Sequence, residues 1–477
     1  MGYVLVIGDV MLDRRTEGEM SHISREAPAP IIRQQQQTDS LGGAGNVARN
    51  IQTLGHQAVL LASIGDDAAG RRVQELCEEY GVHPLLAVTD TPTTVKHRIT
   101  SGGTILCRVD EEEAHPDIMG DHVVSKLQVL AENQTPIDLI VIADYDKGLL
   151  SLAAVQSIRH FAVGIPIFAD VRPNKVDLYE GVGLLKPNFT EAIEMVEHMC
   201  HPGLSDTLSV TERAHTACAQ VSDIYNVPRV VVTAGRHGCV YKTEHMSDPE
   251  LAPPFGVDTE VRDVCGAGDT TMAALAAAYM EKQPFSQGVA FAMQAAGLVV
   301  RQYGVVAPTR EELGEFVRTH GGPSHKIHTI ESLVAALTRF RRFHPRKRVA
   351  LLNGCFDGLH SGHIDLFEFA ATRANFVIVA YNDDASLKAL KGEHRPRVPA
   401  PVRARHLSLL PMVDAVVPFS GDVELLARTL NPDVLVKGAD SQEPIPGADY
   451  VRKQGGELAL CPVDSFYITI QDSSGGD

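Results

Sequence analysis

Short runs of aliphatic and β-branched residues, each bounded by turn residues, recur through the N-terminal part of the chain. They lie at Val4–Ile7, Ala58–Ile64, Leu139–Ala143, Ile167–Ala169 and Arg229–Thr233. Between them, apolar residues recur with helical spacing at Asn46–Leu54, Ala69–Tyr80 and Ala153–Phe161. Strands that alternate with helices predict a parallel sheet covered on both faces. The first part of the chain is therefore predicted to be an α/β domain.

Two segments break this alternation. Around Ile31–Gln36 and Thr93–Val109, strand-like stretches follow one another with no helical stretch between them. Consecutive strands without an intervening helix favour antiparallel pairing. We expect these segments to form a small antiparallel lid over a ligand site.

A polar segment rich in glycine and histidine, Thr319–Lys326, interrupts the pattern, and Thr329 can cap an amphipathic helix that runs through Phe340. We expect one domain at residues 1–318, a linker and connecting helix at 319–346, and a second domain at 347–477. The second part repeats the alternation. Its strands are predicted at 349–352, 376–380, 415–418 and 434–436, and its helices from Ser361 and at 402–410 and 423–430. This predicts a compact, doubly wound, Rossmann-like domain.

Composition supports several domains and limits the partners. A chain of 477 residues, 44% of them apolar, exceeds what one hydrophobic core usually supports. The 60 acidic and 43 basic residues give a net charge of −17, which argues against a nucleic-acid-coating surface. For the basic run Arg339–Arg348, a solvated linker face is favoured over a nucleic-acid patch, because the run is short.

The cysteines and the N-terminus indicate a soluble protein of the cytoplasm. The eight cysteines form no C-x-x-C pair and no regular framework, which is typical of reduced thiols. The N-terminal apolar run is five residues long, with no basic flank and no cleavage site. Nor does any stretch approach the roughly 20 apolar residues of a membrane span.

The segment Asp263–Asp269 reads Asp-Val-Cys-Gly-Ala-Gly-Asp and precedes a run of small residues typical of a helix, 270–280. At a helix start, the backbone N–H groups of Gly266, Ala267 and Gly268 can cradle a phosphoryl group. Asp269 can then accept the proton of an attacking hydroxyl group. On these residues alone, tight helix packing with Asp269 as a helix cap explains the pattern equally well.

Three further motifs, Leu41–Asn46, Lys186–Glu191 and Val231–Gly238, occur in the order found in ribokinase-like sugar kinases, and the first part of the chain resembles that family. The resemblance implies a three-layer α/β fold that uses ATP and Mg²⁺. It implies sugar contacts at Asp13, Gly42, Gly43 and Asn46, a water-mediated Mg²⁺ site at Asn188 and Glu191, and an ATP site at Thr233 and Gly235. A capping box is the alternative interpretation of Asn188 and Glu191. The family usually carries threonine where Cys265 stands, and no Walker P-loop is present.

The second chemical signature is Asn353–His363, in which His360 and His363 lie three residues apart where a strand feeds a helix. Both imidazoles can donate hydrogen bonds to phosphate oxygens, while Gly362 lets the backbone approach a ligand. This suits the attack of one phosphate on the α-phosphate of a nucleotide. Metal binding is the alternative, but no third ligand is spaced to complete a site.

This segment resembles the H-x-G-H motif of the cytidylyltransferase-like superfamily. Motifs in both halves, Gly8–Asp13, Ile23–Pro30, Asp144–Gly148, Tyr381–Gly392, Arg395-Pro396 and Leu435–Asp440, resemble the bifunctional heptose kinase/adenylyltransferase family. The resemblance implies phosphorylation of a heptose 7-phosphate at the anomeric oxygen. After a separate phosphatase has acted, adenylyl transfer from ATP to heptose 1-phosphate would give ADP-heptose for bacterial surface polysaccharide. Besides the catalytic His360 and His363, it implies a nucleotide and phosphate pocket formed by Gly354, Phe356, Asn382, Asp383, Lys391, Lys437 and Asp440.

One element departs from that family. Where the family has Ser-Thr-Thr at the start of a last helix, this chain has Pro462–Gln471, whose aromatic and β-branched residues favour a strand. Two alternatives therefore stay open: a kinase for another sugar, with a transferase of other nucleotide specificity or impaired activity, or a non-catalytic sugar-nucleotide sensor. The resemblance also implies a homodimer formed by the kinase domain.

Overall fold

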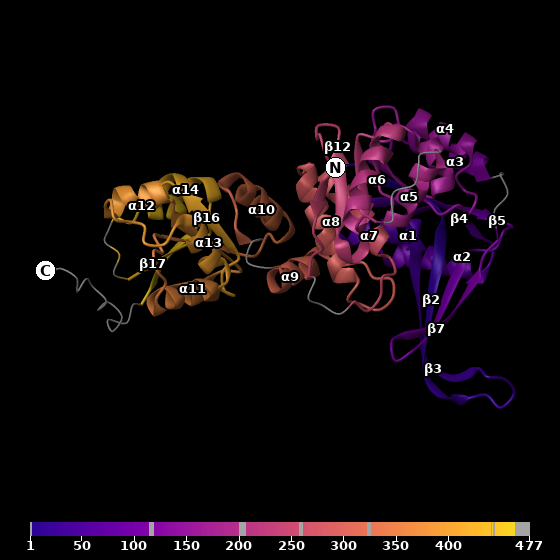
Figure 1. The fold of residues 1–477 in the computed structure, drawn as a ribbon, viewed down its shortest axis with the longest axis horizontal. Helices are drawn as coiled ribbons and strands as arrows, with labels where there is room; N and C mark the ends of the chain where they lie inside the picture. The colour runs from indigo at the N-terminus through magenta and orange to yellow at the C-terminus, as the bar shows by residue number, and fades with distance from the viewer. Residues whose placement is uncertain are drawn as a thin grey trace. The chain divides into compact units, whose positions relative to one another are not determined.

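The computed structural model of the chain describes residues 2–113, 119–199, 207–256, 261–321, 326–439, 441 and 444–462. The chain forms two compact units, unit 1 (residues 1–317) and unit 2 (residues 318–477). Each unit has its own sheet, made wholly or mainly of parallel strands, and its own hydrophobic core, and Figure 1 labels their helices and strands.

The main sheet in the described part of unit 1 has nine strands. In spatial order they are β13 (Glu250–Ala252), β12 (Cys239–Thr243), β11 (Arg229–Thr233), β10 (Leu184–Leu185), β9 (Ile167–Val171), β8 (Ile137–Asp144), β1 (Tyr3–Gly8), β4 (Ala58–Gly65) and β5 (His83–Thr89). From β11 to β5 the strands are parallel, and β12 and β13 are antiparallel additions. The predicted strands are confirmed as β1, β4, β8, β9 and β11.

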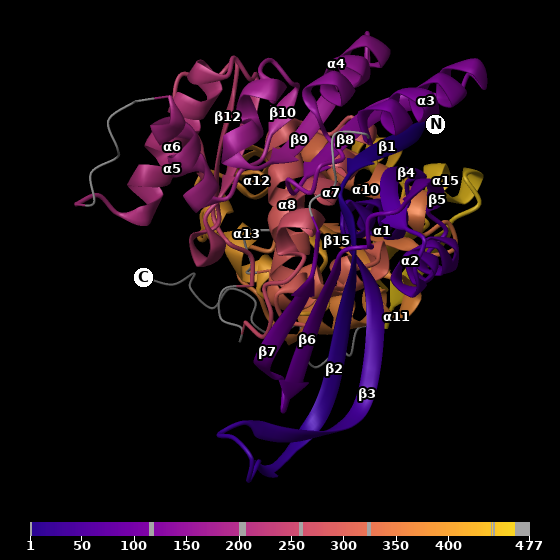
Figure 2. The same ribbon diagram turned by 90° about the vertical axis from the view of Figure 1, so that its right-hand side faces the viewer.

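Helices cover both faces of this sheet, so unit 1 has three layers (Figures 1 and 2). Side chains of β1 alternate between the faces, as the strand period of two requires: Val4 and Val6 belong to one hydrophobic cluster, and Leu5 and Ile7 to the other. The first cluster includes residues of α1 (Ala44–Thr53), α2 (Ala68–Glu79), α7 (Ala267–Met280), α8 (Phe285–Val299) and α9 (Arg310–His320). The second includes residues of α3 (Met119–Glu132), α4 (Leu152–Phe161), α5 (Phe189–His198), α6 (Val210–Ile224) and the 3₁₀ helix η1 (Pro173–Tyr179).

The lid is a four-stranded sheet within the described residues, and Figure 2 shows its strands projecting side by side from unit 1. Its order is β3 (Pro30–Gly43), β2 (Val10–Ile23), β6 (Val95–Ser101) and β7 (Thr104–Glu111). The expected antiparallel pairing holds for β2 with β3 and for β6 with β7, but β2 and β6 pair in parallel. The prediction also missed β2, because its charged residues hide the alternation of a strand.

Unit 2 has a parallel sheet whose order is β16 (Ala415–Phe419), β15 (Phe376–Asn382), β14 (Val349–Gly354), β17 (Val434–Gly438) and β18 (Glu457–Cys461). Its helices are α10 (Ile330–Phe343), α11 (Ser361–Arg373), α12 (Asp384–Lys391), α13 (Ala400–Ser408), α14 (Val423–Leu430) and α15 (Ala448–Lys453). Helices again lie on both faces, α10, α14 and α15 on one and α11 and α13 on the other. Leu333 and Leu337 of α10 are buried in the core of unit 2, so the helix expected in the connecting segment is part of this unit. In neither unit is a described helix both long enough and apolar enough to span a bilayer.

Candidate active sites

The first site lies at the carboxyl ends of the parallel strands of unit 1. The strand order reverses at β1, which lies between β4 and β8, and α/β sheets open a ligand crevice at such a point. The Asp9 carboxylate, just past β1, accepts hydrogen bonds from the backbone N–H groups of Tyr145 (2.9 Å) and Lys147 (3.1 Å), just past β8. Burial, and then the charge of Asp144, raises the pKa of Asp9 to about 6. Asp9 therefore joins the two strand ends that border the site.

Helix α7 begins at Ala267, so the helix expected at 270–280 starts three residues earlier than predicted. Its N-cap residue, Gly266, has a φ of 76°, and a Cβ there would come within 2.8 Å of the Asn46 Nδ2 atom. Glycine is therefore required at this position. Gly266 and Gly268 line a cavity of about 500 Å³ together with Cys265. The Ala267 N–H group instead donates to the Val264 carbonyl (3.3 Å), so this amide is already used within the turn.

Asp269 lies in the first turn of α7 and lines the same cavity. Its Oδ2 atom accepts a hydrogen bond from Asn46 Nδ2 (2.8 Å), and its Oδ1 atom accepts one from the Tyr145 hydroxyl group. Burial raises the pKa of Asp269 to about 6, although both hydrogen bonds lower it. A carboxylate with this pKa, beside glycine amides at a helix N-terminus, is suited to take a proton during phosphoryl transfer near neutral pH.

Asn46 has a different place from the expected one. Its side chain, on α1, is fully buried against α7, and it does not line the cavity. The amide nitrogen donates to Asp269, and the amide oxygen accepts from Asn50 Nδ2 (3.0 Å). Both ends of the amide are thus engaged within the protein, so Asn46 holds the carboxylate rather than contacting a sugar.

The lid contributes Asp13, which lies in β2 and lines the cavity. Asp13 forms an ion pair with Arg98 of β6, and a Cβ at Gly42 would come within 2.1 Å of its Oδ2 atom. Burial raises the pKa of Asp13, and Arg98 opposes this effect. Gly43 also lines the cavity, with a φ of 55°, whereas Gly42 makes room for Asp13. Arg98 lies in no recognisable motif, so it could not be predicted from the sequence.

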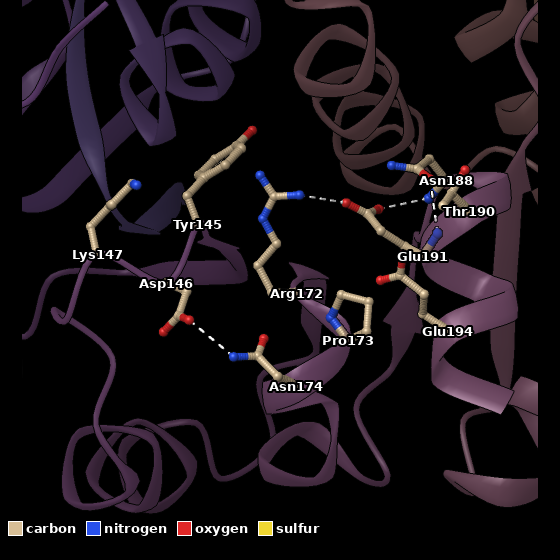
Figure 3. A pocket seen from close by; sticks show the side chains of 10 residues that line it. All are labelled: Tyr145, Asp146, Lys147, Arg172, Pro173, Asn174, Asn188, Thr190, Glu191 and Glu194. Atoms are coloured by element: carbon tan, nitrogen blue, oxygen red, sulfur yellow. Dashed lines mark hydrogen bonds and ion pairs between the residues drawn. The ribbon is translucent and has the colours of Figure 1, made fainter. Parts of the chain in front are cut away.

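Asn188 and Glu191 form a capping box, which was the alternative interpretation of this pair. Asn188 Oδ1 accepts from the Glu191 N–H group (3.0 Å), and Glu191 Oε2 accepts from the Asn188 N–H group (2.9 Å). Glu191 also pairs with Arg172 (3.0 Å), as Figure 3 shows. Despite these contacts, Asn188 and Glu191 both line the cavity, together with Thr233 and Gly235. Gly235 is the first residue of the 3₁₀ helix η2 (Gly235–His237). A buried ion pair that the sequence analysis missed, between Lys186 and Asp170 (2.8 Å), lies in the same cavity.

A second cavity, of about 290 Å³, shares Asp13, Arg98, Cys265 and Val305 with the first. Its charged lining consists of Arg14, Arg15, Arg49, Arg98, Asp13 and Asp39. Arg14 pairs with Asp39 (2.8 Å), and Arg98 with Asp13. Arg49 stacks 4.0 Å from the Tyr80 ring centre and donates to the Val305 carbonyl (3.3 Å), but no described carboxylate lies within ion-pair distance of it, and its buried Nε atom has no partner. This arginine-rich cavity therefore has an excess of positive charge in an acidic chain.

The second site lies in unit 2 at the carboxyl end of β14, where the strand order again reverses. His360 is the N-cap residue of α11, and the His360 and His363 rings stack with centroids 3.8 Å apart. Burial, and then the charge of His360, lowers the pKa of His363 to about 4. The buried Nδ1 atom of His363 has no hydrogen-bond partner. Among the described side chains, no group of three potential metal ligands forms here or elsewhere.

Several of the residues expected around these histidines have structural contacts. Phe356 is buried against His363 and Phe367, so its side chain packs in the core instead of contacting a nucleotide. The Asp383 carboxylate caps α12 through the Ser386 N–H group (2.7 Å) and accepts from Ser420 Oγ (2.8 Å).

The other expected transferase residues lie at strand and helix ends. Gly354 ends β14, Asn382 ends β15, Lys437 lies near the end of β17 with Nζ 3.5 Å from the Asn353 carbonyl, and Lys391 ends α12. Burial lowers the pKa of Lys437. Carboxyl ends of parallel strands share one edge of a sheet, so Gly354, Asn382 and Lys437 lie along the same edge. Asp440 and residues 463–477, which include the altered C-terminal segment, lie outside the described residues.

Arg403, on α13, was not predicted as a functional residue, yet it joins several loops of this site. Its side chain is fully buried and donates to the carbonyl groups of Cys355 (2.8 Å), Asn382 (2.6 Å) and Val398 (2.9 Å). It also pairs with Asp384 (2.6 Å). A single guanidinium group therefore fixes the ends of β14 and β15 relative to each other.

We expect Arg403→Met to destabilise unit 2 by about 3 kcal/mol, because it leaves buried carbonyl oxygens without donors. Amide hydrogen exchange in β14 and β15 measures this loss, and it should rise about a hundredfold. Arg405→Met, at an exposed position of the same helix, serves as the control. Equal exchange in the two variants would contradict the proposed bracing role.

Comparison with known proteins places both units in families. Residues 1–313 match the pfkB family carbohydrate kinases, and residues 351–462 match the cytidylyltransferase-like family. Among solved structures, phosphofructokinase-2 from Escherichia coli covers 67% of this chain and 99% of its own, with a TM-score of 0.54 and 18% identity. Ribokinase from Arabidopsis thaliana covers 66% of this chain and 98% of its own, with a TM-score of 0.50 and 22% identity. These two structures establish the fold of unit 1.

Similarity over nearly the whole chain is found with curated bacterial proteins. The bifunctional protein HldE of Hyphomonas neptunium is 35% identical over 98% of this chain and 94% of its own length. The protein of the same name from Pseudomonas fluorescens is 37% identical over 96% and 93%. The order of the two domains is therefore the one expected from the sequence. The chain belongs to the HldE family of bifunctional proteins, in which a pfkB-type carbohydrate kinase is joined to a cytidylyltransferase-like nucleotidyltransferase.

Proposed function

We propose that unit 1 phosphorylates a heptose 7-phosphate at its anomeric oxygen with ATP. Unit 2 then transfers the adenylyl group of ATP to a heptose 1-phosphate, giving ADP-heptose and pyrophosphate for bacterial surface polysaccharide. A separate phosphatase removes the 7-phosphate between the two steps. The observation that carries the kinase assignment is the buried Asp269 carboxylate at the glycine-lined start of α7. We place both steps in the cytoplasm, where ATP is supplied.

In the kinase reaction, the anomeric hydroxyl group donates its proton to Asp269 as its oxygen attacks the γ-phosphorus of ATP. The new oxygen–phosphorus bond forms, the bond to ADP breaks, and the proton remains on Asp269. Backbone N–H groups at the start of α7, around Gly266 and Gly268, stabilise the charge on the transferring group. Lys186 adds a fixed positive charge in the same cavity.

The residues present fit a magnesium ion bound mainly through water. Mg²⁺ prefers oxygen ligands and keeps much of its hydration. Glu191 and Asp170 bring carboxylate oxygens into the cavity, and Asn188 brings an amide oxygen. Each Glu191 oxygen makes one hydrogen bond to the protein, which leaves lone pairs for ordered water. When bound, Mg²⁺ would neutralise the phosphate charge of ATP. Thr233 and Gly235 are proposed to line the ATP site.

The arginine-rich cavity favours a phosphorylated sugar as the kinase substrate. It shares Asp13 and Arg98 with the cavity that contains the base, so one sugar can reach both. Arg49 would receive the distal phosphate, because it has no carboxylate partner among the described residues. Arg15 would assist it, because its ion pairs with Glu17 (3.4 Å) and Asp263 (3.7 Å) are long. Planar guanidinium groups suit phosphate recognition.

A panel of sugars tests this assignment. With ATP and Mg²⁺, the protein should release ADP with a heptose 7-phosphate and much less with the unphosphorylated heptose. Arg49→Met should raise KM for the 7-phosphate about tenfold and leave KM for the unphosphorylated heptose unchanged. ADP release with hexose or pentose phosphates but not with the heptose would instead support a kinase for another sugar.

In the transferase reaction, an oxygen of the sugar 1-phosphate attacks the α-phosphorus of ATP and pyrophosphate leaves, without a covalent enzyme intermediate. His360 and His363 donate hydrogen bonds to the phosphate oxygens on which charge accumulates. Lys391 and Lys437 supply positive charge, and Gly354 and Asn382 border the nucleotide. The stacked histidines at the start of α11 are the observation that supports this assignment.

The raised pKa of Asp269 predicts the pH dependence of the kinase. Phosphorylation requires the ionised carboxylate, so kcat/KM for the sugar should be constant at alkaline pH and fall tenfold per unit below pH 6. A carboxylate with an ordinary pKa would give a limb near pH 4. Steady-state rates between pH 4.5 and 8.5, measured in buffers about half a pH unit apart, would distinguish the raised pKa from the ordinary one. A kcat/KM that stays nearly constant over this whole range would contradict the assignment of Asp269 as a buried base.

We further propose a homodimer formed through the lid. The edge strand β7 is exposed along its whole length, including Ile105, Leu106 and Val109. An exposed edge with apolar side chains is the kind of strand that another chain covers. Light scattering should give twice the chain mass of 51.6 kDa, and Leu106→Glu should give the single-chain mass. A wild-type protein of single-chain mass at micromolar concentration would contradict this proposal.

A further inference from the structure

Two described side chains, those of Asn46 and Tyr145, donate hydrogen bonds to the proposed base, Asp269. The sequence suggested no role for Tyr145. It lies just past β8 and lines both the cavity that contains Asp269 and a neighbouring cavity bordered by Arg172 and Glu191 (Figure 3). Its hydroxyl group donates to Asp269 Oδ1, on the side of the carboxylate opposite to the Asn46 contact.

The position of Tyr145 is fixed at three points. Its backbone N–H group donates to Asp9 (2.9 Å), and the Arg172 guanidinium lies 5.7 Å from its ring centre. On another side, a Cβ at Gly43 would come within 3.3 Å of the ring, which shows how closely the glycine backbone packs there. Figure 3 shows the ring pointing away from the neighbouring Asp146. A side chain held in this way can impose an orientation on the group to which it is bonded.

We propose that Tyr145 is a positioning residue of the kinase: its hydroxyl group and the Asn46 amide together hold the Asp269 carboxylate in the orientation that accepts the proton of the sugar hydroxyl group. This inference rests on the proposed kinase function. An ionised carboxylate has about four acceptor sites, so the two protein donors leave acceptor capacity for the substrate. The two bonds prevent rotation of the carboxylate, and such fixed geometry lowers the barrier of proton transfer.

The same hydrogen bond favours the ionised form of the base. A donor to a carboxylate stabilises the charged state and lowers its pKa. The groups around Asp269 are Tyr145 and Asn46, the negative Asp170 and the positive Lys186, and burial itself outweighs the rest and raises the pKa. Removal of the Tyr145 hydroxyl group should therefore move the acid limb of the kinase to higher pH.

Tyr145→Phe tests the proposal, because phenylalanine fills the same space without the hydroxyl group. We expect kcat to fall about tenfold with KM for the sugar little changed, and the acid limb to move up by about one pH unit. Tyr179→Phe is a matched control: Tyr179 is also buried and donates to a carboxylate, Asp144 (2.7 Å), but it does not line either cavity at the base. This control should leave both kcat and the acid limb unchanged.

The possible outcomes separate the proposal from its premise. If the wild-type protein phosphorylates no sugar, the proposed function fails. If the wild type is active and Tyr145→Phe keeps both kcat and the acid limb, the positioning role is overturned. Melting temperatures of the two variants show whether folding is affected. Should Tyr145→Phe not fold, Tyr145→Met, which also removes the hydroxyl donor, carries the test: it should show the same fall in kcat and the same upward shift of the acid limb, and wild-type values of both would overturn the proposal.

Discussion

Asp269→Asn is expected to reduce kcat of sugar phosphorylation by about a thousandfold while ATP still binds. Asparagine has nearly the same shape as aspartate. Its amide oxygen can accept from Asn46 Nδ2, and its amide nitrogen can donate to the Tyr145 hydroxyl oxygen, so both contacts at this position can persist. What is lost is the ability to take the proton of the attacking hydroxyl group. The effect should therefore fall on kcat and leave KM for ATP unchanged.

The second unit of the same chain provides an internal control for this variant. Pyrophosphate release from ATP and a heptose 1-phosphate should be the same in Asp269→Asn as in the wild type, because the two sites belong to separate compact units. ADP release measured in parallel isolates the kinase. A variant that keeps kinase turnover would remove Asp269 as the base, and a variant that loses both activities would indicate misfolding.

The strands that could be predicted from the sequence are those buried on both faces of the sheet. Strands such as β1 and β4, buried on both faces, appear as continuous apolar runs, and the start of α11 at Ser361 follows from the glycine and histidine pattern before it. The lid strand β2 was missed because it carries Asp13, Arg14 and Arg15 and is exposed toward its end. An exposed strand lacks the apolar signal on which such predictions depend.

The site was predicted only in part. Local motifs singled out Asp269, with its glycines, and the histidine pair as expected site residues, because such residues are contiguous in sequence, and the structure brings Asp269 to a cavity and stacks the two histidine rings. They could not identify Arg49, Arg98 or Arg403, whose importance comes from partners far away in the chain. Motifs also overstated contacts: Asn46 and Asp383 use their polar atoms to hold the protein together. Sequence spacing shows which residues share an element, but not which atoms remain free.

His363→Ala is expected to reduce kcat of adenylyl transfer by about a hundredfold to a thousandfold, the range measured for removal of one donor to a developing negative charge. With a pKa of about 4, His363 is uncharged at neutral pH and donates through one N–H group. The ratio of the wild-type rate to the His363→Ala rate should therefore be the same at pH 5.5 and pH 8. For a histidine that acts as a cation, this ratio would fall as the pH rises.

Pyrophosphate release from ATP and heptose 1-phosphate measures this loss, with kinase activity in unit 1 as the internal control. His406→Ala, at an exposed position of α13, is the matched control and should keep the wild-type rate. His363→Gln keeps an N–H donor and should recover part of the activity, because the contribution of the neutral ring is a hydrogen bond and not a charge. If His363→Ala keeps the wild-type rate, the stacked rings pack against Phe356 for structural reasons alone, and the transferase assignment of this site fails.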